Sequence, residues 1–102
     1  MRIVITPRAF DDIAAAAGYV AQDNPAAAGH LVDRVFEIID LLAEGGLDGP
    51  LTTLRSGVEV RSWPVQPLRI YYRREADELI ILKAVPPKKP TTKASRARRT
   101  KK

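Results

Sequence analysis

The chain has 102 residues, of which 45% are hydrophobic and 28% charged, and this composition predicts one small globular domain. Its formal net charge is +5 at pH 7, and the absence of cysteine excludes disulfides, thiolate metal sites and cysteine nucleophiles. A single histidine cannot build a multi-histidine metal site, so we expect no metal and place His30 on a helix surface.

The positive charge belongs to the second half of the chain. Residues 1–50 carry three arginines and eight acids, whereas residues 51–102 carry fourteen basic and four acidic residues. Eight of the basic residues and no acid follow Pro86, so the chain before it has a net charge of −3. We therefore expect a folded domain over residues 1–87 and a flexible basic tail over residues 88–102, which alone would bind polyanions without specificity.

The first half of the chain predicts a short strand and two helices. Residues 2–5 form an apolar run that suits an opening strand. Thr6-Pro7 and Asn24-Pro25 each place a capping side chain before a proline, which predicts that helices begin at Pro7 and Pro25. The first helix should end near Gln22 and the second at Gly45-Gly46. So short a break between them predicts a helical hairpin.

Each predicted helix carries an apolar stripe at helical spacing. In the first helix the stripe is Phe10, Ile13, Ala17 and Val20. In the second it is Ala28, Leu31, Val35, Ile38 and Leu42, widened by Ile39.

The second half of the chain predicts a loop and three strands. Residues 47–57 contain Gly-Pro and Ser-Gly pairs and suit a connecting loop. Residues 58–63, 68–74 and 79–85 are rich in β-branched and aromatic side chains, and their short connections predict an antiparallel meander. The predicted fold is α+β, with the helical hairpin packed on a small antiparallel sheet in the order β-α-α-β-β-β.

Alternation along these strands predicts an apolar face and a basic face. We expect the face with Val58 and Val60 to pack on the hairpin, together with Leu68, Ile70 and Tyr72. The opposite face would gather guanidinium and aromatic groups, which bind phosphates and stack on unpaired bases. The alternative is that the aromatic residues only cover the sheet while the arginines keep it soluble. The residues of this expected basic face are Arg61, Trp63, Arg69, Tyr71 and Arg73.

Other patterns point away from enzyme chemistry. No serine or threonine has a plausible histidine partner, and Gly45-Gly46 follows a helix where a phosphate loop would open one, so we expect no cofactor. Neither a signal-peptide core nor a membrane-spanning run is present, which predicts a cytoplasmic protein without membrane contact.

Four acids share one helix face, which suits a solvated flank or a docking surface for a basic partner: Asp33, Glu37, Asp40 and Glu44.

Several phrases in this order resemble the RelE/ParE superfamily of bacterial type II toxins. They are Ala9-Phe10-Asp11-Asp12-Ile13, Tyr19-Val20-Ala21, Asn24-Pro25-Ala26-Ala27-Ala28, Leu54-Arg55-Ser56-Gly57-Val58, Leu68-Arg69-Ile70-Tyr71-Tyr72-Arg73 and the strand Leu79–Val85. The resemblance covers residues 2–87, and the long hairpin with its Asn-Pro junction is similar to the ParE branch, often called plasmid stabilisation proteins.

The resemblance implies a toxin that inhibits growth when free and is neutralised in a complex with its cognate antitoxin. For the ParE branch it implies inhibition of DNA gyrase by binding. The alternatives are a RelE-like ribosome-dependent mRNA endonuclease and a degenerate, non-toxic member. No tyrosine follows Tyr72, whereas RelE-type toxins usually have one near the C-terminus, so binding is favoured over catalysis. An endonuclease would use Arg61, Arg69 and Lys88. The residues expected to contact the target or the antitoxin are Arg61, Trp63, Arg69, Tyr71, Arg73, Lys88 and Lys89.

Overall fold

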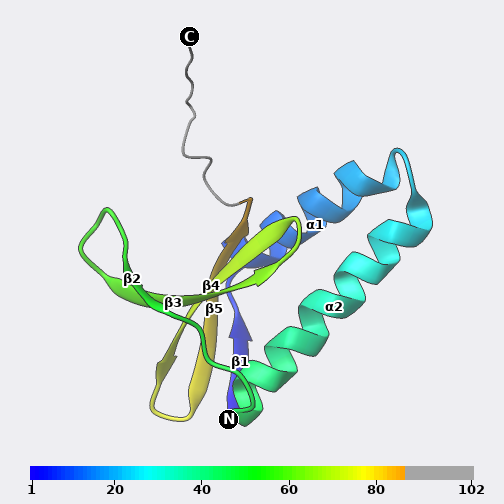
Figure 1. Ribbon diagram of the computed structural model, residues 1–102. Coiled ribbons are helices and arrows are strands. Elements are labelled where there is room, and N and C mark those ends of the chain that lie inside the picture. The colour runs from blue at the N-terminus through cyan, green and yellow to red at the C-terminus, as the bar shows by residue number, and fades with distance from the viewer. Residues whose placement is uncertain (87–102) are drawn as a thin grey trace, which may run out of the picture.

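The structure, a computed structural model, describes residues 1–86 and packs two helices against one face of a five-stranded sheet (Figure 1). The predicted tail, residues 88–102, lies outside the described residues. The elements are β1 (Arg2–Ile5), α1 (Pro7–Ala21), α2 (Pro25–Glu44), β2 (Leu51–Thr53), β3 (Glu59–Val65), β4 (Leu68–Glu75) and β5 (Glu78–Val85).

The helical hairpin is confirmed, together with the side chains that begin each helix. The Thr6 hydroxyl oxygen accepts a hydrogen bond from the Ala9 N–H at 3.2 Å, and the Asn24 side-chain oxygen accepts one from the Ala27 N–H at 3.1 Å. Each bond satisfies an N–H group that has no partner within its helix. At the other end of α2, Gly45 adopts a left-handed φ of 86°, which a residue with a side chain rarely adopts.

The sheet differs from the prediction in two respects, because it is mixed and has a fifth strand. Its order is β1-β5-β4-β3-β2, with β1 parallel to β5 and the other neighbours antiparallel. Both helices and three strands separate β1 from β5 in the chain, so no tight turn imposes an antiparallel pairing. β2 arises inside the predicted loop, where Leu51, Thr52 and Thr53 pair with the start of β3.

β3 is shifted along the chain relative to the predicted strand, and it runs through Pro64 to Val65. The Ser62 N–H donates to the Pro50 carbonyl at 3.2 Å, so it points toward the β2 side of β3. The nitrogen of Pro64, two residues further on, points the same way. β2 pairs only with Glu59, Val60 and Arg61 of β3, so no strand lies beside Pro64 on that side. The N–H that proline lacks would therefore have had no partner in the sheet.

The hydrophobic core lies between the hairpin and the sheet. The helices contribute Ile13, Leu31, Val35, Ile39 and Leu42, and the sheet contributes Val65, Leu68, Ile70, Tyr72, Leu79, Ile81 and Ala84. Phe10, which was expected in the core, is 59% exposed, and Ala9 is fully buried in its place. The buried stripe of α1 is therefore Ala9, Ile13, Ala16 and Val20, and Phe10 lies about 100° further round the helix.

Polar side chains of the first helix cover the edge of β5 beyond the end of β1. The Thr6 hydroxyl donates to the Ile81 carbonyl at 2.9 Å, and the Asp12 carboxylate accepts the Ala84 N–H at 3.1 Å. These bonds occupy backbone groups of an edge that another strand would otherwise pair with. They also fix α1 against the sheet.

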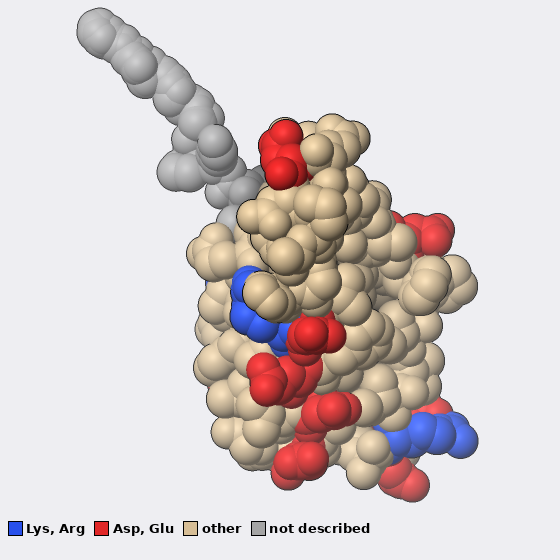
Figure 2. Space-filling model, turned by 90° about the vertical axis from the view of Figure 1, so that its right-hand side faces the viewer, with Lys and Arg blue, Asp and Glu red and all other residues tan. Residues whose placement is uncertain are grey.

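The exposed face of α2 carries the four predicted acids, all of them in solvent: Asp33, Glu37, Asp40 and Glu44. Figure 2 shows carboxylates following one another down this side of the molecule, with few basic side chains among them. His30 is exposed on the same helix, as expected.

Candidate functional site

The strand register divides the predicted basic face between the two sides of the sheet. Arg61 lies opposite Tyr72, and Trp63 lies opposite Ile70. Directly paired residues point to the same side of a sheet, so Arg61 and Trp63 lie on the side that the helices cover. Trp63 accordingly packs against the core. The prediction that these two residues share a face with the arginines of β4 is wrong.

The opposite side of the sheet, here called the open face, carries Arg69, Tyr71 and Arg73 of β4. Val60 and Ser62 of β3 point to this side, because Ser62 lies opposite Tyr71. Val60 is 1% exposed but is not part of the core cluster, so its expected packing on the hairpin is also wrong. The two faces of β3 are thus exchanged relative to the prediction, because one residue of register in its pairing with β4 decides which side chains point to which side.

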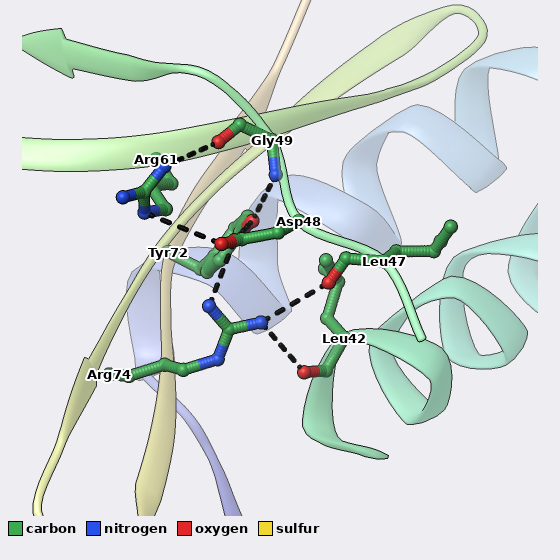
Figure 3. Close-up of polar contacts among 7 residues, drawn as sticks. All are labelled: Leu42, Leu47, Asp48, Gly49, Arg61, Tyr72 and Arg74. Carbon is green, nitrogen blue, oxygen red and sulfur yellow. Dashed lines mark hydrogen bonds and ion pairs between the residues drawn. The ribbon is translucent and has the colours of Figure 1, made fainter. Parts of the chain in front are cut away.

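Arg61 belongs to a polar cluster that joins the loop after α2 to the sheet (Figure 3). Its guanidinium donates to the Gly49 carbonyl at 2.9 Å and lies 3.7 Å from the Asp48 carboxylate. The Tyr72 hydroxyl donates to Asp48 at 2.8 Å and accepts the Gly49 N–H at 2.7 Å. Arg74 donates to the same carboxylate at 2.8 Å. We call Asp48, Gly49, Arg61, Tyr72 and Arg74 the Asp48 cluster.

Arg74 also binds the end of the second helix. It donates to the Leu42 carbonyl at 2.9 Å and to the Leu47 carbonyl at 3.3 Å, both of which Figure 3 shows. A cation is favoured at a helix C-terminus, where carbonyls lack partners within the helix. Gly49 allows the close approach of this loop, because a Cβ there would lie 1.7 Å from the Ser62 carbonyl oxygen.

The cluster shifts the titration of its two acidic groups in opposite directions. Hydrogen bonds from Arg74 and then from Tyr72 lower the pKa of Asp48 below its ordinary value. Burial, above all, raises the pKa of Tyr72. The cluster thus holds an ionised carboxylate against a neutral phenol. Its bonds are to backbone and core groups, so its geometry suits anchoring of the α2–β2 connection.

The open face has a different character, because its cations have fewer protein partners. Arg69 donates to the Ser62 hydroxyl at 2.8 Å, and Arg73 pairs with Glu75 at 3.1 Å. The ammonium of Lys83 lies 4.9 Å from the centre of the Tyr71 ring. These groups can bind an anion together with an apolar or aromatic group.

Lys83 was not among the predicted site residues, because simple alternation misplaces it. Leu79 and Ile81 point into the core, so counting by two would direct Lys83 there as well. Instead Tyr72 pairs with Ile81, whereas Tyr71 pairs with Lys83, which leaves one extra residue in β5. This bulge places Lys83 on the open face and Ala84 in the core. The available signal was a single lysine within the otherwise apolar run of residues 79–85.

Lys88 and Lys89 lie outside the described residues. Over residues 1–86, no group of three or more His, Cys, Asp or Glu side chains could hold a metal ion. Neither helix in this part of the chain is long and apolar enough to cross a membrane.

Comparison with known proteins identifies the family. The chain is similar to a chain of the chromosomal ParDE TA system from P. aeruginosa, with a TM-score of 0.70 and 20% sequence identity over 84% of this chain and 95% of that chain. No curated protein matches. The family model described as the ParE toxin of the type II toxin–antitoxin system parDE matches residues 3–89. The chain, with its helical hairpin on a five-stranded sheet, therefore belongs to the ParE toxin family of type II toxin–antitoxin systems.

Proposed function

We propose that this toxin inhibits growth when free, is neutralised by a cognate antitoxin in a hetero-oligomer, and acts by binding DNA gyrase. The family match over residues 3–89 is the observation that carries the proposal. It also agrees with a toxin domain over residues 1–87, to which residues 88–102 add a basic extension.

We propose the open face as the main contact surface for target or antitoxin, through Arg69, Tyr71 and Arg73. Lys88 and Lys89 follow the last described strand and would extend the contact. Arg61 and Trp63 lie on the helix side of the sheet, so they would serve a contact there or hold the fold.

Support for binding over catalysis comes from Arg61. An endonuclease of RelE type would use Arg61 and Arg69 together on RNA phosphates. In the structure their strand positions face opposite sides of the sheet, and the Arg61 guanidinium is bonded to Gly49 and Asp48.

The first experiment is induction of the chain in bacteria with and without co-expression of a candidate antitoxin. We expect growth to stop on induction alone and to resume when the cognate antitoxin is co-expressed. Normal growth at good expression would instead identify a non-toxic family member. Replacing Arg69 and Arg73 by glutamine should weaken inhibition, whereas Arg2→Gln with Arg34→Gln removes the same charge elsewhere on the chain and serves as the matched control.

The second experiment identifies the target. Purified protein is added to a gyrase supercoiling reaction and, in parallel, to ribosomes programmed with mRNA. We expect loss of supercoiling and intact mRNA. Codon-phased cleavage with unaffected gyrase would overturn the gyrase proposal and establish the endonuclease.

A further inference from the structure

The open face contains a hollow of about 430 Å³ between the β2–β3 loop and the end of β5. Its volume is in the range of small-molecule sites. We call it the basic hollow. Its lining includes two cations, an aromatic ring, two threonines and an apolar wall: Arg55, Lys83, Tyr71, Thr52, Thr53 and Val85.

The charge of the basic hollow is not balanced by the protein around it. No acidic residue lines it, and neither Arg55 nor Lys83 forms an ion pair with any residue in the range 1–86. A cation without a carboxylate partner keeps its full attraction for a ligand anion. Thr52 is paired with Val60, so its side chain lies on the open face and its hydroxyl adds a neutral hydrogen-bond donor there.

Positive charge continues from the basic hollow along β4. Arg69 and Arg73 lie two residues before and after Tyr71, so all three point to the open face, at intervals of about 7 Å. The carboxylate paired with a cation here is that of Glu75, at the end of the strand. A row of cations along a strand suits a polymer with regularly repeated charge better than a single carboxylate.

We propose that the basic hollow binds one nucleotide of a single-stranded nucleic acid. A phosphate lies between Arg55 and Lys83, the base packs on the Tyr71 and Val85 wall, and the neighbouring phosphates follow Arg69 and Arg73. The protein contacts the phosphates of the nucleic acid and the flat face of a base. Binding therefore tolerates changes in the nucleotide sequence and weakens as the salt concentration rises. The inference goes beyond the proposed function, because it requires neither growth inhibition nor gyrase.

The test is a titration of a fluorescein-labelled single-stranded oligonucleotide with the full-length protein, followed by fluorescence anisotropy at several salt concentrations. Arg55→Gln with Lys83→Gln should weaken binding about tenfold and lower the salt slope by about 0.7, since the two side chains share one phosphate and each lost phosphate contact removes about 0.7. Arg2→Gln with Arg34→Gln removes the same charge elsewhere and should leave the affinity within about twofold. Basic residues after Pro86 are retained in all variants, so their contribution is common to every titration.

A second variant tests the aromatic wall. Tyr71→Leu removes no charge and should weaken oligonucleotide binding about fivefold or more, with an unchanged salt slope. Arg55→Gln alone, in an exposed loop, keeps the test valid if a sheet variant fails to fold.

Two results would overturn the inference. One is equal binding by the hollow variants and the Arg2/Arg34 control, which would place oligonucleotide binding elsewhere on the chain. The other concerns a labelled glutamate-rich peptide. If this peptide binds, if its binding requires Arg55 and Lys83, and if the oligonucleotide does not displace it, the inference is wrong. That result would make the hollow a site for an acidic protein segment. Growth assays of the same variants report separately on the proposed function.

Discussion

At the scale of single residues, the Tyr72 hydroxyl connects the sheet to the loop after α2. Tyr72 is fully buried. Its hydroxyl accepts a hydrogen bond from the Gly49 N–H and donates one to the Asp48 carboxylate. Tyr72→Phe should lower the free energy of unfolding by about 1–3 kcal/mol, because a buried N–H loses its partner. Urea denaturation measures this value. Tyr71→Phe, on the open face, is the control and should change the stability by less than about 0.5 kcal/mol.

Asp48 makes part of the stability depend on pH. The folded state lowers its pKa, so its ionised form stabilises the fold above the unfolded pKa of about 3.9, and this contribution disappears as the pH falls through the folded value. Asp48→Asn should therefore be less stable than the wild type at pH 7, and the difference should shrink below pH 4. Denaturation series from pH 7 to pH 2 measure it. A constant difference across the series would contradict this account.

At the scale of elements, Asp12 is one of the side chains that fix α1 to β5. The Asp12 carboxylate accepts the N–H of Ala84, which is 1% exposed. Asp12→Ala should lower the free energy of unfolding by about 1–3 kcal/mol and should speed hydrogen exchange at the Ala84 amide. Asp11→Ala removes the same group from an exposed position of the same helix, so it should stay within about 0.5 kcal/mol of the wild type. Equal effects of the two variants would argue against the link.

Element type was more predictable than element faces. Thr6-Pro7 and Asn24-Pro25 predict both helix starts, because a cap depends on residues within one turn of it. The side to which Arg61 and Trp63 point depends on how β3 pairs with β4, which alternation within a single strand does not determine. Phe10 was misplaced for a similar reason, since the tertiary contacts of α1 decide which stripe is buried.

At the scale of the whole molecule, the core cluster of the described residues 1–86 is built from residues 9–84, and residues 91–102 contain two alanines as their only apolar side chains. Deleting residues 91–102 should therefore leave the melting temperature unchanged within about 2 °C, because little apolar burial is lost. Differential scanning calorimetry of the full and shortened chains measures the shift. A large decrease would show that the deleted residues dock on the body, with the acidic face of α2 as the oppositely charged surface.

The α+β class, the helical hairpin with its caps, and the contrast in charge between the residues before and after Pro86 follow from the sequence alone. These features depend on residues close together in the chain and on composition, both of which can be read directly from the sequence. The tertiary structure was needed to show that Arg61 joins the Asp48 cluster, that a bulge places Lys83 on the open face, and that Arg55 and Lys83 line the same hollow. Each of these depends on how neighbouring strands pair and on how loops fold back on the sheet, and one residue of register decides which side chains meet.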